Sequence, residues 1–178
     1  MSGFPDPFED LAGELRRGPG REWEEEQAAA EEESLLVRLR RRSLADVARE
    51  AMHRGSRVRL LFEGISVEGA VVQIGKDYLS VDAGDRTVDV RLGRVVIRLL
   101  PAVGPGGSSG GASATFRARL AEYEQTGEEV TVVGPSTRPQ GRVSLLATDH
   151  LVLADRNGEL VVPLELVAAV IRHRLTDR

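Results

Sequence analysis

The sequence contains no cysteine. This absence excludes a disulfide framework, thiol chemistry and a zinc site built on thiolates. It is compatible with the cytoplasm, because disulfides are typical of proteins from oxidising compartments. We therefore expect a cytoplasmic location.

Long hydrophobic runs are also absent. No apolar stretch approaches the roughly 20 residues that a helix needs to cross a bilayer. The first residues, MSGFPDPFEDL, carry acids where a signal peptide has a basic and then an apolar region. We expect a soluble chain that is not secreted and has no membrane partner.

Histidine is scarce, with three in the chain. His53, His150 and His173 lie far apart without ligand spacing, which favours surface or edge positions over metal binding. Ser144, Asp149 and His150 can be arranged as a triad on paper, but no nucleophile-elbow pattern surrounds them. The sequence therefore predicts no metal, no cofactor and no enzyme.

Charge is unevenly distributed along the chain. The net charge is −4, yet residues 1–34 alone hold eleven acidic residues against three arginines. From Ser43 onward acids and bases balance at 17 each. A balanced surface is not what a generic polyanion-binding protein presents.

What the chain does contain is a tandem repeat. A displacement of 72 residues superposes Gly69 on Gly141, Val90 on Val162 and Leu92 on Leu164. Repetition at such a period indicates two copies of one structural unit. The last strand is ambiguous, because the VIR at 96–98 also matches the VIR at 170–172, which leaves its register open by two residues.

Each copy begins with a short amphipathic helix. Ser43 and Asp46 form a capping-box pattern, and Gly55 is placed as the C-terminal stop. The matching signals of the second copy are Thr115 or Ser113 at the start and Gly127 at the end.

About five short strands follow each helix, separated in the first copy by glycines. In the first copy we predict strands at 58–62, 67–74, 78–81, 87–92 and 95–99. In the second copy we predict them at 129–133, 141–146, 150–153, 159–163 and 167–172.

These patterns divide the chain into four parts. A Gly/Ser-rich stretch between the copies is typical of a flexible linker. The predicted parts are an acidic tail and charged helix (1–42), the first repeat (43–100), the linker (101–114) and the second repeat (115–178).

The N-terminal part has two segments. Residues 1–20 are rich in Pro, Gly and acids, and Phe8, Leu11 and Leu15 stand at helical spacing as a candidate docking motif. A tail that only keeps the protein soluble is the favoured alternative. Residues 21–42 are good helix formers, acidic first and basic last, which complements a helix macrodipole.

The first copy resembles a known family. The segment VRLLFEGISVEG, with Gly64 and Gly69 five residues apart, is similar to the first motif of the Sm-like small β-barrels, which include the Sm and LSm proteins and bacterial Hfq. The resemblance covers 43–99, and the second copy keeps Gly141 but has a different early turn. It implies a mainly β fold with short helices (α+β): two tandem five-stranded barrels, Sm-like or SH3-like, each preceded by a helix. It also implies strand edges that pair with neighbours.

The RNA-binding motifs of that family do not carry over. Its RNA-binding members have an Asp-x-x-x-Asn pattern after the second glycine, whereas Asp77 is followed here by Tyr78, Leu79 and Ser80. An Arg-Gly pair precedes their last strand, but Leu99 follows the corresponding arginine in this chain.

The function we predict is a non-catalytic adaptor that binds a protein partner or copies of itself. The alternative is an RNA- or DNA-binding regulatory protein with a basic patch able to contact phosphates. Against this alternative, aromatic residues that could stack on bases make up only 4% of the chain, and the arginines can instead pair with the acidic tail. The candidate partner or phosphate contacts are Arg38, Arg40, Arg41, Arg42, Arg57 and Arg59.

Overall fold

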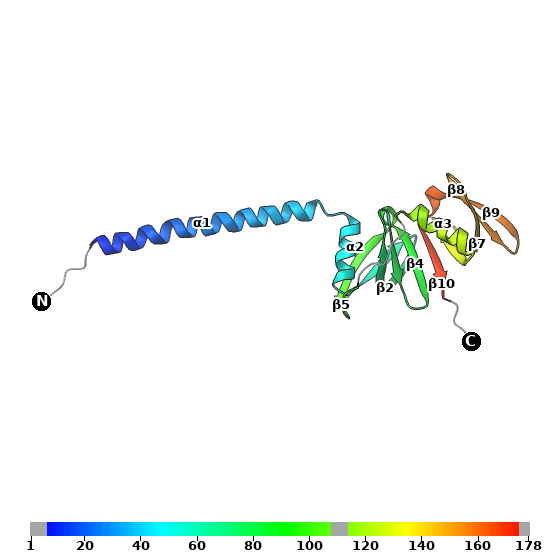
Figure 1. The fold of residues 1–178 in the computed structure, drawn as a ribbon, viewed down its shortest axis with the longest axis horizontal. Helices are drawn as coiled ribbons and strands as arrows, with labels where there is room; N and C mark the ends of the chain where they lie inside the picture. Colours follow the sequence, from blue (N-terminus) through cyan, green and yellow to red (C-terminus); the bar gives the residue numbers. More distant parts are fainter. Residues whose placement is uncertain (1–6, 108–113, 175–178) are drawn as a thin grey trace. The chain divides into compact units, whose positions relative to one another are not determined.

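The structure is a computed structural model that describes residues 7–107 and 114–174 of the chain. For residues 7–22 and for Glu25 it describes the backbone only. The chain divides into two compact units, one up to Arg42 and one from Ser43 onward (Figure 1), and each is described by itself. No helix among the described residues is both long and apolar enough to span a membrane.

In the described part of the first unit, one long helix, α1, runs over Pro7–Arg40. It starts earlier than the predicted helix at 21–42 and ends with Arg38 and Arg40 in its last turn. Leu35 is 51% exposed and Leu39 is 46% exposed, so these apolar side chains face solvent to a large extent.

The second unit opens with α2 (Leu44–His53). Its capping box is confirmed, because the Ser43 side chain accepts from the Asp46 backbone N–H while the Asp46 carboxylate accepts from the Ser43 N–H. The apolar stripe of α2 packs on the sheet through Ala48, Ala51 and Met52.

The five strands predicted for the first copy are confirmed to within two or three residues at their ends. Glu63 and Gly64 both have positive φ, which is the type I′ geometry that joins two strands through a two-residue turn. The elements are β1 (Ser56–Phe62), β2 (Ile65–Ile74), β3 (Tyr78–Asp82), β4 (Arg86–Arg91), the 3₁₀ turn η1 (Leu92–Arg94) and β5 (Val96–Ala102).

The second copy repeats this order. Its helix is capped by Thr115, which was one of two predicted caps, and ends at Gly127 in the left-handed conformation. The elements are α3 (Phe116–Thr126), β6 (Glu129–Val133), β7 (Gln140–Leu146), β8 (His150–Asp155), β9 (Gly158–Pro163), the 3₁₀ turn η2 (Leu164–Leu166) and β10 (Ala169–His173).

The predicted closed barrels are wrong. All ten strands form one open antiparallel sheet in the order β5-β1-β2-β3-β4-β10-β6-β7-β8-β9. The physical reason is that β4, which would have to close the first barrel, pairs with β10 of the second copy instead. The fold is mainly β with three helices, and the two copies share one continuous sheet (Figure 1).

Backbone hydrogen bonds hold part of the linker against the C-terminal end of α2 and the residue Gly55 that follows it. Val103 donates to the Gly55 carbonyl and Gly107 donates to the Met52 carbonyl. A Cβ on Gly106 would lie 1.7 Å from the His53 carbonyl oxygen, so only glycine fits this approach. Residues 108–113 lie outside the described part of the chain.

The strand pairings fix the register of the repeat. Val58 pairs with Gly69 and Val130 pairs with Gly141, which confirms the displacement of 72 residues. The last strand differs, because Ile97 pairs with Leu60 and Val170 pairs with Val132, a displacement of 73. Both sequence alignments of that strand, at 72 and at 74, are therefore wrong by one residue.

Each of the two buried clusters contains side chains from both copies. The first cluster lies under α2 and includes Val133, Ala169 and Ile171 from the second copy. The second lies under α3 and includes Tyr78 from the first copy, whose ring centroid is 6.1 Å from that of Phe116. Neither copy therefore has a core made only of its own residues.

Candidate functional site

The strand pair β4–β10, which we call the internal junction, is the contact that joins the two copies. It has five residue pairs, from Ala169 opposite Val90 to His173 opposite Arg86. One further backbone bond flanks each end, from Arg91 N–H to the Ala168 carbonyl at 3.0 Å and from Arg174 N–H to the Asp85 carbonyl at 2.9 Å.

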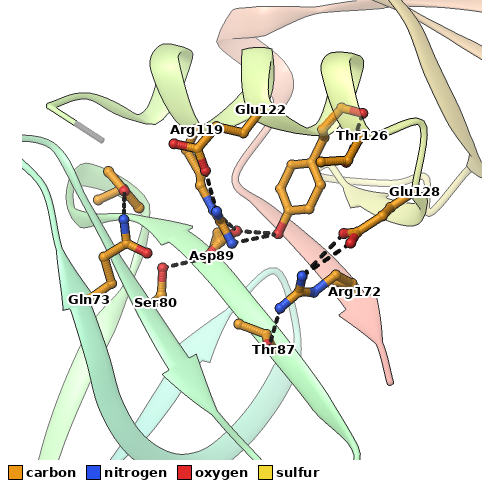
Figure 2. Close-up of polar contacts among 11 residues, drawn as sticks. Gln73, Ser80, Thr87, Asp89, Arg119, Glu122, Thr126, Glu128 and Arg172 are labelled. Carbon is orange, nitrogen blue, oxygen red and sulfur yellow. Dashed lines mark hydrogen bonds and ion pairs between the residues drawn. The ribbon is translucent and has the colours of Figure 1, made fainter. Parts of the chain in front are cut away.

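A buried polar cluster around Asp89 fastens α3 over this junction (Figure 2). Asp89 is completely buried and accepts hydrogen bonds from the hydroxyls of Ser80 and Tyr123. It also accepts from Arg119 Nε at 2.8 Å, and the Arg119 side chain is only 14% exposed. The Arg119 guanidinium also donates to Glu122 and, at 3.4 Å, to the Tyr123 hydroxyl.

The pKa shifts follow from this geometry. Burial raises the pKa of Tyr123, and the neighbouring Asp89 charge raises it further. Burial alone would lower the pKa of Arg119, but its interactions with Asp89 and Tyr123 outweigh burial and raise the pKa. Tyr123 therefore stays protonated as a hydrogen-bond donor and Arg119 stays a cation. The cluster keeps the same hydrogen bonds and the same ion pair.

The three residues that could form a triad on paper, Ser144, Asp149 and His150, have the following contacts in the structure. The Ser144 hydroxyl donates to the Val152 carbonyl at 3.3 Å, and His150 Nδ1 contacts Asp149 at 2.7 Å. That contact lowers the pKa of Asp149. Across the described residues no group of three His, Cys, Asp or Glu side chains could hold a metal ion.

The candidate arginines fall into two groups. Arg57 and Arg59 lie on β1 and both contact Glu68, at 3.5 and 2.9 Å. The other group, in the first unit, has exposed side chains and consists of Arg38, Arg40, Arg41 and Arg42. Their binding role stays a prediction.

The candidate docking motif lies within the helix α1. The side chains of Phe8, Leu11 and Leu15 lie outside the part of the chain whose side chains are described. This motif also stays a prediction.

A hollow of about 640 Å³ lies at one end of β7 and β8. Glu129 and Asp155 line it together with Arg142 and Arg156. Because both signs of charge meet there and it is open and mostly polar, it indicates no particular ligand.

The outermost strands of the sheet are β5 and β9. In the described part of the chain each is paired on one side only, β5 with β1 and β9 with β8. Val96 on β5 is 64% exposed, and Leu160 and Val161 on β9 are 46% and 58% exposed. Unpaired backbone groups beside apolar side chains can add a strand from another chain.

Asp89 was not predicted from the sequence. Strand β4 alternates as Thr-Val-Asp-Val, and alternation places Asp89 opposite the core-facing Val88 and Val90, where solvent is the ordinary expectation. A signal was available in the second helix. Arg119 and Tyr123 stand there four residues apart, where the first helix has Val47 and Ala51.

No protein-family model matches the sequence, and none of the curated proteins matches it either.

Proposed function

We propose that this chain is a cytoplasmic, non-catalytic binding protein that takes up protein strands at the two outer edges of its sheet, β5 and β9. The observation that carries the proposal is the exposure of apolar side chains along both strands, each paired on one side only in the described residues. Two such edges at opposite ends of the sheet allow one molecule to join two partners, as an adaptor does (Figure 1).

We also propose that each copy is a Sm-like unit in an open form. A capped helix followed by five antiparallel strands supports this relationship in both copies. So does the close approach at the motif glycine, where a Cβ on Gly69 would lie 2.1 Å from the Asp82 carbonyl oxygen. The matching distance from Gly141 to the Ala154 carbonyl oxygen is 2.6 Å.

The test is site-specific photo-crosslinking in the full chain. A photoreactive amino acid replaces Leu160 on β9 or Val96 on β5, and the control replaces Val72, which is 42% exposed on the inner strand β2. We expect protein adducts from both edge positions and none from the control. No protein adduct at either edge, or equal adducts at Val72, would overturn the proposal.

The second candidate function is nucleic-acid binding by Arg38, Arg40, Arg41 and Arg42. The exposure of all four side chains favours it. Changing all four to alanine then lowers RNA affinity and reduces the slope of log affinity against log salt by about one for each phosphate that these arginines bind. An unchanged slope rules out phosphate binding by these residues. In the second unit, Arg57 and Arg59 already contact Glu68, which weakens their case.

A further inference from the structure

We propose that one face of the strands β7, β8 and β9 is a docking site for an amphipathic helix of a partner protein. The site consists of Leu145, Val152 and Val161, which we call the apolar row. Strand pairing places Leu145 opposite Val152 and Val152 opposite Val161, so the three side chains share one face of the sheet. This site goes beyond the proposed function, because it lies on a face of the sheet and not at an edge.

The first copy shows what covers the equivalent face. At a displacement of 72 residues the equivalents are Gln73, Ser80 and Asp89, which we call the polar row, and the same strand pairing joins them. Helix α3 lies over this row, where Asp89 accepts hydrogen bonds from Arg119 and Tyr123 (Figure 2). Ser80 and Asp89 are buried there. A helix is therefore the element that this face receives in the first copy.

The apolar row has the reverse combination of polarity and exposure. Leu145 is 49% exposed and Val161 is 58% exposed, while Val152 between them is 8% exposed. An antiparallel sheet with one solvated face ordinarily turns polar side chains to water and apolar ones to a packed layer. In the described part of the chain the polar row is covered and the apolar row is open. The apolar row therefore fits a further layer that packs on it.

The sequence of β8 and β9 carries the same signal. Each strand has three consecutive apolar residues, at 151–153 and 160–162. Leu151, Leu153 and Val162 belong to the cluster under α3, which leaves Val152 and Val161 for the opposite face. Consecutive apolar residues are typical of strands that are covered on both faces. In the described residues α3 covers one of the two.

The contacts of α3 define the kind of helix that fits. It reaches the first copy through Phe116, Arg119 and Tyr123, at positions i, i+3 and i+7 of one helix face. Arg119 and Tyr123 both donate to Asp89, whose equivalent in the apolar row is Val161. A guanidinium or a phenol hydroxyl against Val161 would lose this acceptor, which is unfavourable in a buried contact. The partner helix therefore needs apolar side chains at i+3 and i+7.

The first of the three positions is best filled by an aromatic residue. The ring centroid of Phe116 lies 6.1 Å from that of Tyr78 and 5.0 Å from the guanidinium carbon of Arg91. The equivalents of these two residues, His150 and Pro163, form the matching cross-strand pair. An imidazole and a proline ring both offer flat surfaces to an aromatic ring. We therefore expect an aromatic residue at i, followed by apolar residues at i+3 and i+7.

Helix α2 of a second copy does not supply this pattern. It has Leu44 where α3 has Phe116 and Ala51 where α3 has Tyr123. Ala51 is 3% exposed in the cluster under α2, and its side chain ends at Cβ, so it cannot also reach a second sheet. A helix of another protein is the occupant that fits, in the manner of helix-in-groove recognition by anchors on one face.

The test measures the binding of two labelled helical peptides to the full chain by fluorescence anisotropy. Both peptides share one alanine-rich sequence. The apolar peptide has Phe, Leu and Leu at i, i+3 and i+7, and the polar peptide has Phe, Arg and Tyr there, as α3 does. We expect wild type to bind the apolar peptide about tenfold or more tightly than the polar peptide, because only the apolar peptide removes further apolar surface from water.

Substitutions in the full chain locate the binding. Leu145→Asp and Val161→Asp should each weaken binding of the apolar peptide about tenfold or more, because either change puts a charge into the apolar row. The matched control is Val96→Asp, since Val96 is 64% exposed on β5, and it should leave binding unchanged. Val161→Asp should also bind the polar peptide more tightly than wild type does, because the new carboxylate can accept from Arg and Tyr as Asp89 does. That gain requires a folded variant.

Three outcomes overturn this docking site. The first is an apolar peptide that binds wild type no more tightly than the polar peptide. The second is a loss of binding on Leu145→Asp and Val161→Asp no larger than on Val96→Asp. The third is self-association of wild type, measured by light scattering, that is lost on Val161→Asp, because a second copy would then occupy the apolar row.

Discussion

The internal junction and the outer edges of the sheet are built from equivalent strands but differ in side-chain chemistry. Asp89, completely buried under α3, holds the junction through three donors. Its equivalent on the outer edge is Val161, which is 58% exposed. The backbone geometry is thus common to both strands. The side chain at this one position, Asp89 or Val161, determines what each strand can pack against.

The buried charge at the junction is more convincing as a device for selecting partners than as a source of stability. Burying an ion pair removes two charges from water, and the gain from their attraction is often offset by that loss. Placing β9 against α3, however, would put Val161 where Asp89 accepts from Arg119 Nε, and the partly exposed Glu122 would be the carboxylate that remains to Arg119. Removing one partner of a buried ion pair is strongly unfavourable, so this arrangement favours β4 over β9.

The largest expected effect comes from breaking the junction at Asp89. Asp89→Ala removes the common acceptor of Ser80, Tyr123 and Arg119, and we expect the free energy of unfolding to fall by about 3–5 kcal/mol. Urea denaturation followed by circular dichroism measures it. Asp85→Ala is the control, because the Asp85 side chain is 73% exposed and its ion pair contributes little. A loss below about 1 kcal/mol for Asp89→Ala would mean that the cluster does not hold the two copies together.

The second-largest expected effect concerns a single hydrogen-bond donor to Asp89, the Tyr123 hydroxyl. Tyr123→Phe removes the hydroxyl that donates to Asp89, and we expect about 1–2 kcal/mol of lost stability near neutral pH. Urea denaturation of both proteins at one pH measures this difference. A Tyr123→Phe protein as stable as wild type would show that the hydrogen bond contributes nothing.

The same pair of proteins has a distinctive pH dependence. The pKa of Tyr123 is raised by burial above its ordinary 10.0, so in the native state the phenol stays protonated after the unfolded chain has begun to ionise. The unfolded state then binds fewer protons, and wild-type stability falls as pH rises above 10. The advantage of wild type over Tyr123→Phe should shrink by about 1 kcal/mol between pH 10 and 11. A constant difference would contradict the assigned burial.

Local sequence signals predicted the elements well. The capping box at Ser43 and the stop at Gly127 are confirmed, and the predicted strands match ten observed ones. These features depend on neighbours within a few residues, through side-chain capping, glycine geometry and alternating apolar positions.

Long-range pairing could not be read from the same signals. The pattern of β4 is the same whether β4 closes a barrel or pairs with β10, because a strand's alternation does not name its neighbour. The shift of one residue in β10 is equally invisible, since the match of VIR at 96–98 with 170–172 suggests a different register.

The sequence by itself determined the repeat, the two capped helices and the ten strands, because each depends on local geometry. Only the tertiary structure decided that β10 inserts between β4 and β6 and makes one open sheet. The same insertion turned Asp89 from an apparently solvent-facing acid into the buried centre of the junction. The physical reason is that a strand exposes one face to whatever packs on it, and here that is a helix from the other copy.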